Sequence, residues 1–164
     1  MALTRPDRYF SRISRINVRT DLLGCGLTHV LLDIDNTIRS RATGDIPLDV
    51  GLWLAQARDA GVQFCLLSNN WHANVHDFAH SLDLPLVAKA CKPLPPAYFA
   101  ARKKIGGVRG STVVIGDQLS TDVVGAHVVG MKAYLVAPLV EQDLKHTLVV
   151  RRFERKLLGE MVPE

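Results

Sequence analysis

The feature that most constrains the fold of this chain is an alternation of short apolar runs with segments of helical periodicity. The apolar runs are rich in Val, Ile and Leu, as expected of strands that are buried on both faces. They lie at residues 27–34, 62–67, 112–115 and 132–137, with a shorter extended stretch at 86–90. Helical patterns separate these runs, and several of them begin at a proline or end at a glycine. The alternation predicts an α/β fold, a three-layer Rossmann-like parallel sheet with helices on both faces.

Length and composition exclude several classes of protein. The 164 residues suffice for one domain with a substantial core, so we expect residues 1–164 to form a single domain. Hydrophobic residues make up 48% and charged residues 22%, which excludes a disordered chain. The net charge of +4 is too small to argue for a nucleic-acid partner, and none is expected. Three cysteines without CxxC spacing favour a reducing compartment, and no apolar run reaches the length of a membrane span, so a cytoplasmic protein is expected.

Both ends of the chain have a basic, amphipathic pattern. Five arginines within the first 20 residues are spaced by three or four, beside an apolar stripe of Tyr9, Ile13 and Ile16. From Leu144 to Leu158, leucine and phenylalanine alternate with basic residues. Helices of this kind either lie on an anionic membrane surface or pack their apolar stripe on the core. The first alternative predicts a protein peripheral to the inner face of a membrane. An organelle transit peptide is a third interpretation of the N-terminus.

Two carboxylates follow the first apolar run, in the sequence Asp33-Ile34-Asp35-Asn36-Thr37. At the end of a strand, Asp33 and Asp35 can meet one cation or one substrate from slightly different directions. By itself the pair is also typical of aspartates that cap a turn. Thr37 is expected to hydrogen-bond its neighbours rather than to take part in chemistry.

Three further motifs follow later strands. Ser68 and Asn69 leave the second strand, either as a hydroxyl and a backbone N–H that hold an anion or as an ordinary turn. Lys92 follows the short extended stretch, either as a solvated charge or as a point charge beside a phosphate. Asp117 ends the next strand, and Asp122 lies where the following helix needs an N-cap or where a ligand site needs an acid.

Together these motifs predict one site, because the carboxyl ends of parallel strands lie at the same edge of a sheet. Asp33, Asp35 and Asp117 would place three negative charges there. Like charges at close range raise one another's pKa and destabilise the fold unless a cation is present. Carboxylates, a backbone carbonyl and water suit Mg²⁺, which also binds substrate phosphate. With Lys92 and the hydroxyl of Ser68, the set predicts a Mg²⁺-dependent site for a phosphoryl group.

The ordered motifs resemble those of the haloacid dehalogenase (HAD) superfamily of phosphohydrolases. The residues that carry the resemblance are DIDNT, a strand-end Ser68, Lys92 and GDQLSTD, in that order. More narrowly, LLSNN, the KP that follows Cys91, the stretch VVIGDQLSTDVVGA, and Pro6 and Tyr9 near the N-terminus are similar to the subclass III, YqeG-type family. That family is related to phosphatidylglycerophosphate phosphatases.

The resemblance implies a role for each motif residue. Asp33 would attack phosphorus and form an aspartyl-phosphate, and Asp35 would protonate the leaving group and then activate water. The phosphate would be held by Ser68, the backbone amide of Asn69 and the ammonium group of Lys92. The acidic residues implied to hold or orient Mg²⁺ are Asp33, Asp35 through its main-chain carbonyl, Asp117 and Asp122.

The spacing of the motifs leaves no room for the inserted cap domain that many HAD proteins carry, so a capless HAD-like fold is expected. Only 23 residues lie between Ser68 and Lys92, room for one helix and a short strand. An open site suits a large substrate or one presented by a surface. Trp71 is expected to be a partly buried helix start rather than a substrate contact. Arg39 and Arg41 are either solvated or face an anionic head group.

The sequence therefore predicts a Mg²⁺-dependent phosphomonoesterase, with phosphatidylglycerophosphate at a membrane surface as the favoured substrate. The alternative enzyme is a phosphatase of a soluble phosphate ester or of a phosphoprotein. A receiver-like signalling module, phosphorylated on aspartate without turnover, uses similar residues. In receivers, however, the acidic pair lies on the first strand, the phosphorylated aspartate on a later one, and the lysine comes last. Here an acidic motif follows Lys92, which favours the phosphatase.

Overall fold

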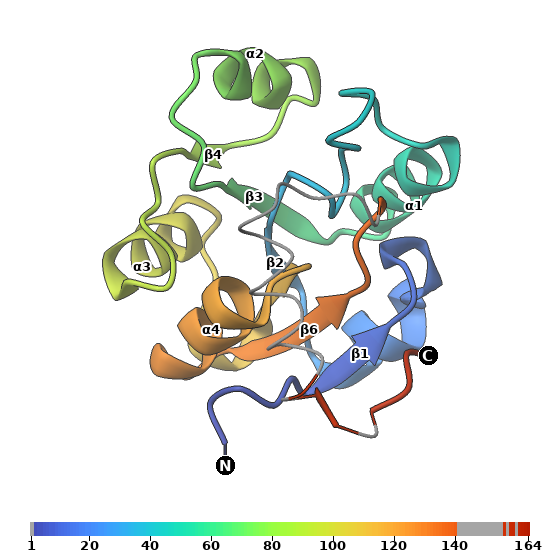
Figure 1. The fold of residues 1–164 in the computed structure, drawn as a ribbon, viewed down its shortest axis with the longest axis vertical. Helices are drawn as coiled ribbons and strands as arrows, with labels where there is room; N and C mark the ends of the chain where they lie inside the picture. Colours follow the sequence, from blue (N-terminus) through green and yellow to red (C-terminus); the bar gives the residue numbers. More distant parts are fainter. Residues whose placement is uncertain (1, 141–155, 157, 160) are drawn as a thin grey trace.

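The computed structural model describes residues 2–140, 156, 158–159 and 161–164. Within these residues six strands form a parallel sheet in the order β1-β6-β5-β2-β3-β4 (Figure 1). The central strand β2 pairs with β3 and β5 in register, so that Leu31 lies opposite Cys65 on one side and Val114 on the other. The strands are β1 (Arg8–Phe10), β2 (His29–Leu32), β3 (Gln63–Leu67), β4 (Leu86–Val87), β5 (Thr112–Gly116) and β6 (Lys132–Val136).

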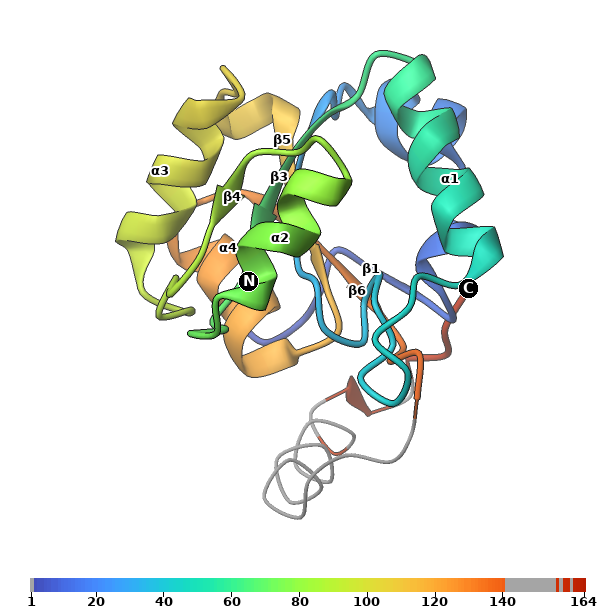
Figure 2. The same ribbon diagram turned by 90° about the horizontal axis from the view of Figure 1, so that it is seen from above.

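Helices cover both faces of the sheet, which confirms the predicted three-layer α/β fold (Figure 2). The helical segment between β5 and β6 begins as a π-helical turn that continues into a short α-helix. The α-helices are α1 (Leu48–Asp59), α2 (Asn74–Ser81), α3 (Pro95–Lys104) and α4 (Val124–Val128). The short 3₁₀ and π segments are η1 (Ile13–Arg15), η2 (Val18–Leu22), η3 (Leu23–Cys25), η4 (Arg109–Ser111) and η5 (Leu119–Val123).

The alternating side chains of the strands build two hydrophobic cores, because successive residues of a strand point to opposite faces. On one face Leu32 and Ile115 pack with Trp53 of α1, whose ring N–H donates to the main-chain oxygen of Ile16 at 2.8 Å. On the other face the strands pack against α3 and α4, with the fully buried Tyr98 at the centre. No cap domain interrupts the described loops that follow β2 and β3.

The prediction of an N-terminal amphipathic helix is wrong for the described residues. The chain instead forms the edge strand β1, which pairs in parallel with β6, and then the turns η1 and η2. Ile13 and Ile16, two residues of the expected apolar stripe, are buried in the core beside α1, together with Phe10. The free energy gained by burying these apolar side chains outweighs the local preference for a helix that the arginine spacing suggested.

Two of the N-terminal arginines form ion pairs with residues of other segments. Arg8 forms ion pairs with Asp21 at 2.6 Å and with Glu164, and Arg12 pairs with Asp49 at 2.5 Å. The Arg12 guanidinium holds the pKa of the Asp49 carboxyl well below its usual range. Most of the basic C-terminal pattern, from Leu144 onward, lies outside the described residues. In the part of the chain that is described, no helix has both the length and the apolar character needed to cross a bilayer.

Candidate active site

Loops at the carboxyl ends of the strands enclose a cavity of about 370 Å³. Asp33 follows β2, Ser68 follows β3 and Asp117 follows β5, as the sequence motifs predicted. The side chains that line the cavity include Asp33, Asp35, Ser68, Asn69 and Lys92, which are all of the residues proposed for catalysis and substrate binding. Asp117 and Asp122 are buried beside them, which brings the predicted site residues to one place.

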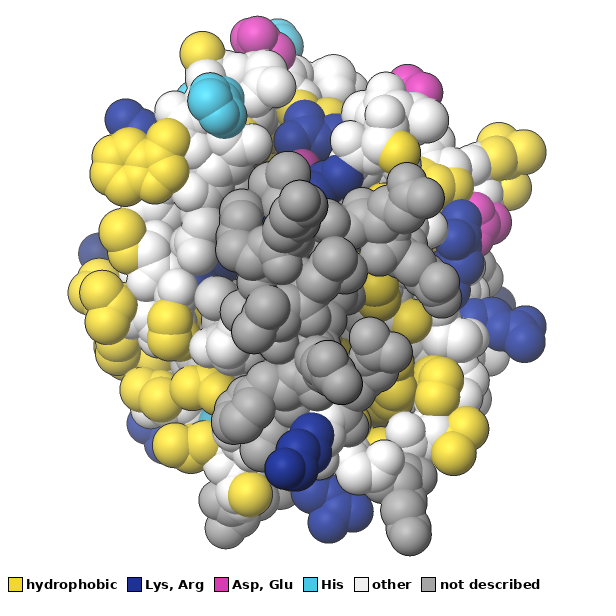
Figure 3. All heavy atoms as spheres, in the orientation of Figure 1, with side chains coloured by type: hydrophobic (Ala, Val, Ile, Leu, Met, Phe, Trp, Pro, Cys, Tyr) yellow, Lys and Arg dark blue, Asp and Glu magenta, His cyan; other side chains and the backbone are white. Residues whose placement is uncertain are grey.

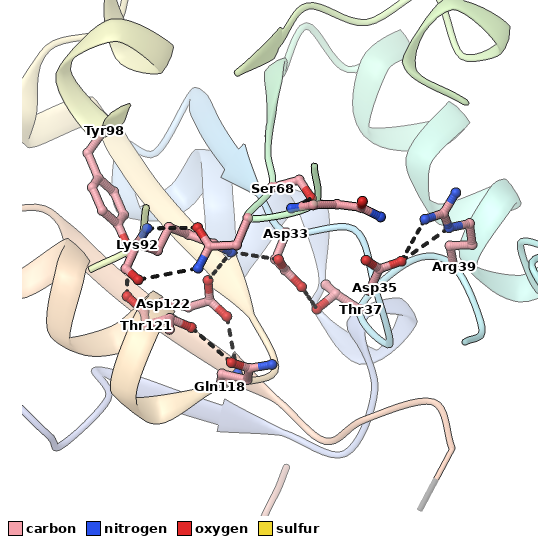
Figure 4. A network of polar contacts seen from close by, with 12 residues as sticks. Asp33, Asp35, Thr37, Arg39, Ser68, Lys92, Tyr98, Gln118, Thr121 and Asp122 are labelled. Atoms are coloured by element: carbon pink, nitrogen blue, oxygen red, sulfur yellow. Dashed lines mark hydrogen bonds and ion pairs between the residues drawn. The ribbon is translucent and has the colours of Figure 1, made fainter. Parts of the chain in front are cut away.

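Lys92 is the centre of the polar network (Figure 4). Its buried ammonium group donates to Asp33 Oδ1 and to Asp122 Oδ1, both at 2.6 Å. Burial alone would lower the pKa of Lys92, but the carboxylates of Asp122 and Asp33 outweigh burial and raise it above its usual value. Lys92 therefore stays charged, and it holds the two carboxylates on either side of it.

Asp33 is the carboxylate that reaches from this network to the cavity. Its second oxygen, Oδ2, accepts a hydrogen bond from the Thr37 hydroxyl at 3.0 Å, which agrees with the positioning role expected for Thr37. Burial raises the pKa of Asp33 to about 6, Lys92 opposes the rise, and the charge of Asp122 adds to it. Without a further cation, the ionised form of Asp33, which a nucleophile requires, is thus less favourable than in a solvated aspartate.

An acidic cluster below the cavity has the composition of a hard-cation site. Asp33, Asp117 and Asp122 each place a carboxylate oxygen within 4.8 Å of the others. Three carboxylates exceed the charge that Lys92 can neutralise, and oxygen ligands of this type suit Mg²⁺ and similar ions. The residues present therefore fit a divalent cation. The side chain of Asp35 is not part of this cluster.

Asp35 points away from the cluster, toward Arg39 (Figure 4). Asp35 Oδ1 accepts from Arg39 Nη2 at 2.7 Å and from Nε at 3.3 Å, and the guanidinium lies 4.7 Å from the ring centre of Phe78. A sharp turn makes this possible, because Asn36 between them adopts a φ of +62°. The interpretation of Arg39 as a solvated charge is therefore wrong, because its guanidinium is largely buried and pairs with Asp35.

The side chain of Asn69 has a role that the sequence did not predict. Asn69 was proposed to bind phosphate through its backbone amide, and it does line the cavity. Its side chain, however, pairs with the backbone of Lys92: Oδ1 accepts from the Lys92 N–H at 2.7 Å, and Nδ2 donates to the Lys92 carbonyl at 3.3 Å. These two bonds tie the end of β3 to the loop that carries Lys92.

Gly116 and Gly125 allow the segment around Asp122 to approach the rest of the site closely. Asp122 Oδ2 accepts from the backbone N–H of Gln118 at 3.1 Å, so Asp122 caps the turn as well as binding Lys92. A Cβ on Gly116 would lie 2.2 Å from this oxygen, and one on Gly125 would lie 2.0 Å from the hydroxyl of Tyr98. That hydroxyl donates to the main-chain oxygen of Thr121 at 2.7 Å. The two glycines are the only sequence signal that could have indicated this packing.

We expect Gly116→Ala to lower the free energy of unfolding by about 1–3 kcal/mol and to reduce any activity of the site. The added methyl group must push Asp122 away from Gln118 and from Lys92. Urea unfolding measures the first effect. Gly110→Ala is the matched control, since a Cβ there meets nothing within 4 Å. Equal stability of the two variants would contradict the predicted close contact.

The exposure of Trp71 is greater than the sequence predicted. Trp71 was predicted to be a partly buried helix start, but it is 67% exposed, precedes α2 and lines the cavity. The Lys89 ammonium lies 5.2 Å from the centre of its ring. Local periodicity could not reveal this, because the exposure of Trp71 depends on where the loop after β3 lies relative to the cavity.

Comparisons with known proteins agree with this fold. A family model described as HAD-hydrolase-like matches residues 90–147. The probable phosphatase YqeG of Bacillus subtilis (strain 168) is 29% identical over 154 residues, which cover 94% of this chain and 89% of that protein. Sequence similarity thus extends over nearly the whole length of both proteins.

Solved structures of a phosphatase and of a putative hydrolase share the fold. The cobalt-bound deoxy-D-mannose-octulosonate 8-phosphate phosphatase from Haemophilus influenzae superposes with a TM-score of 0.55 at 16% identity, over 81% of this chain and 88% of that chain. A putative HAD superfamily (subfamily III A) hydrolase from Legionella pneumophila gives a TM-score of 0.55 at 18% identity, over 81% and 76% of the two chains. These similarities concern the arrangement of the sheet and helices.

Proposed function

We propose that this chain, which is a phosphatase of the HAD superfamily and similar to YqeG, hydrolyses phosphate monoesters in two steps through a phosphorylated Asp33. The observation that carries the proposal is the placement of Asp33 between a buried lysine and the open cavity. Lys92 contacts one oxygen of Asp33 at 2.6 Å, and Asp33 also lines the cavity. A carboxylate can attack an anionic phosphate only when nearby positive charge offsets their repulsion.

In the first step a carboxylate oxygen of Asp33 forms a bond to phosphorus, and the bond between phosphorus and the ester oxygen breaks. Asp35 gives a proton to the departing oxygen, which leaves as an alcohol. In the second step Asp35 takes a proton from water, whose oxygen attacks phosphorus and releases inorganic phosphate and Asp33. Dividing the reaction through a covalent intermediate lowers the barrier that one direct displacement would face. The contact with Arg39 holds the Asp35 carboxyl in one position beside the cavity.

Ser68 is suited to hold the phosphate through its hydroxyl. Ser68 Oγ accepts from the backbone N–H of Asn70 at 3.1 Å, so its own proton is available for a ligand oxygen in the cavity. The backbone N–H of Asn69 is proposed to add a second donor, and Lys92 supplies charge.

Mg²⁺ is the cation proposed for the acidic cluster. Asp33 and Asp117 would hold it with the main-chain carbonyl of Asp35, and Asp122 would orient that set. When bound, Mg²⁺ supplies positive charge that offsets the charge of the phosphate and of Asp33. We expect phosphate release from simple esters to require Mg²⁺ and to stop when a chelator removes it. Release that continues at an unchanged rate in excess chelator would overturn the metal assignment.

Phosphatidylglycerophosphate is the substrate that we propose, at the cytoplasmic face of a membrane with which the protein makes peripheral contact. The support is the resemblance of the motifs and the cavity without a cap domain; the N-terminal basic helix no longer contributes. A soluble phosphate ester or a phosphoprotein is the alternative. Phosphate release from liposomes that contain phosphatidylglycerophosphate, compared with release from soluble esters and phosphopeptides, tests the choice. Faster release from the soluble substrates would favour the alternative.

We expect Asp35→Asn to slow turnover by roughly 100- to 10,000-fold, because the amide can neither protonate the leaving group nor activate water. The fold should be retained, since Asp35 lies outside the network centred on Lys92 and the asparagine oxygen can still accept from Arg39. Steady-state phosphate release and thermal unfolding measure the two effects. A variant with the wild-type rate would refute the acid–base role of Asp35.

A further inference from the structure

Lys92 lies outside the helices and strands, in the loop between β4 and α3. Two of the residues before it, Lys89 and Cys91, have left-handed backbone, with φ of +50° and +51°. The side chain of Lys92 is only 3% exposed, and its ammonium group contacts both Asp33 and Asp122 (Figure 4). Other Lys and Arg side chains, in contrast, lie on the surface of the molecule (Figure 3). An irregular loop therefore has to bring this ammonium group to a fixed place in the interior.

Backbone hydrogen bonds to the segment after β3 hold the first part of this loop. The N–H of Ser68 donates to the main-chain oxygen of Val87 at 3.0 Å, and the N–H of Ala90 donates to that of Ser68 at 3.0 Å. This pairing has ended at Lys92. Among the described residues, the hydrogen bonds that reach the backbone of Lys92 both come from the side chain of Asn69.

The side-chain amide of Asn69 continues the pairing where the backbone no longer does. Its Oδ1 accepts from the N–H of Lys92 at 2.7 Å, and its Nδ2 donates to the main-chain oxygen of Lys92 at 3.3 Å. A residue in an antiparallel pair of strands exchanges the same two kinds of bond with its partner. An amide side chain can do so because it carries an acceptor and a donor on one planar group.

Asn69 is also placed beside the substrate. It lines the cavity together with Asp33, and its backbone N–H is proposed to donate to the phosphate. Through its side chain, Asn69 thus connects this phosphate donor to the backbone of Lys92, whose charge offsets the charge of the phosphate. A shift of about 1 Å in a group that takes part in a reaction can lower the rate about 100-fold. The place of the Lys92 backbone is therefore expected to matter for turnover.

We infer that Asn69 is a positioning residue, whose side chain holds the backbone of Lys92 so that the ammonium group stays between Asp33 and Asp122. The inference rests on the proposed phosphatase function, because it gives the side chain of Asn69 a role in that reaction. Without the amide, the loop keeps its backbone bonds to the segment after β3 but loses both bonds at Lys92. The ammonium group is then held less firmly where phosphorus is attacked.

Two substitutions of Asn69 separate the amide from the size of the side chain. Asn69→Leu is similar in size and removes both hydrogen bonds, whereas Asn69→Gln keeps the amide and moves it by one methylene group. Asn69 is exposed, so both variants are expected to fold, which thermal unfolding checks. Asn74→Leu, at the exposed start of α2, is the matched control, because no hydrogen bond between described residues involves the Asn74 side chain.

The first measurement follows the accessibility of Lys92 and does not require activity. Reductive methylation with formaldehyde and a borane reductant, followed by mass spectrometry of peptides, gives the rate at which each lysine reacts. We expect Lys92 to react about tenfold faster in Asn69→Leu than in the wild type or Asn74→Leu, and at an intermediate rate in Asn69→Gln. Lys103, which is exposed on α3, should react equally in all four proteins.

The second measurement is steady-state phosphate release from the lipid, soluble ester or phosphopeptide that the wild type hydrolyses fastest. We expect kcat of Asn69→Leu to fall about tenfold. KM should change by less than about threefold, because the hydroxyl of Ser68 still faces the cavity. Asn69→Gln should regain part of kcat, and Asn74→Leu should retain all of it.

A wild-type kcat in Asn69→Leu would overturn the inference, whether or not Lys92 becomes reactive, and would leave the phosphatase function intact. A raised KM with Lys92 still protected would also overturn it, because Asn69 would then act on the ester directly. A wild-type protein that hydrolyses none of the esters would overturn the proposed function. In that case, protection of Lys92 in Asn69→Leu would overturn the positioning by Asn69 independently.

Discussion

Asp33→Asn is expected to lower the rate of phosphate release by a factor on the order of 10⁴ or more, because the amide cannot attack phosphorus. The loss should appear in kcat, since Ser68 and Lys92 still face the cavity and can bind the ester. The asparagine oxygen can still accept from the Thr37 hydroxyl, which now contacts Asp33 at 3.0 Å. The variant is therefore expected to fold as the wild type does.

The melting temperature of Asp33→Asn shows whether a loss of activity reflects the missing carboxylate or a loss of the fold. Burial and Asp122 raise the pKa of Asp33 to about 6, so the folded, metal-free protein holds the Asp33 proton more tightly than the unfolded chain does. Stability is thus lost as the pH rises from the ordinary aspartate value of 3.8 through about 6, because ionisation of Asp33 is less favourable in the folded protein. We expect the melting temperature of metal-free Asp33→Asn at pH 8 to be no lower than that of the wild type. Retained hydrolysis by a folded Asp33→Asn variant would show that Asp33 is not the nucleophile.

Lys92→Met is expected to have the largest effect on stability. The substitution leaves Asp33 and Asp122 buried without the ammonium group that contacts each at 2.6 Å. Removing one partner of a buried ion pair costs about 3–5 kcal/mol. Methionine keeps most of the volume of the side chain, so the decrease in the free energy of unfolding results from the missing charge rather than from poorer packing. Turnover should fall as well, since the charge that offsets the phosphate is gone.

The loss in Lys92→Met should depend on pH and on divalent cations. Protonation of the carboxylates relieves their repulsion, so the destabilisation should be greater at pH 8 than at pH 5. Mg²⁺ should restore part of the lost stability if it binds the same carboxylates. Chemical unfolding at both pH values measures the effect, with Lys103→Met on the surface of α3 as the matched control. Equal stability of the two variants at pH 8 would contradict the central role of Lys92.

The sheet could be predicted from sequence because its central strands are apolar and separated by clear helical patterns. β2, β3 and β6 lie within the predicted runs, and β5 extends one residue beyond its run, to Gly116. β1 could not be predicted, because it has only three residues and pairs with a strand more than 120 residues later. The arginine spacing suggested a helix there, whereas Arg8 and Arg12 have partners that are distant in sequence.

The site could be located from sequence because parallel strands deliver their carboxyl ends to one edge. That rule places Asp33, Ser68 and Asp117 together whatever their distance along the chain. The partners within the site could not be predicted, because they depend on side-chain directions set by tertiary packing. The bonds from Asn69 to the backbone of Lys92 and the contact between Arg39 and Asp35 are of this kind.

The most direct test of the proposed mechanism is to trap the phosphorylated protein. Asp35→Asn, mixed with a phosphate ester and Mg²⁺ and then quenched with acid, should carry one phosphoryl group on the peptide that contains Asp33, as detected by mass spectrometry. A chelator added before the ester should prevent the labelling. Phosphate release by the wild type, with no phosphoryl group on Asp33 in the quenched variant or with one on another residue such as Ser68, would contradict the mechanism.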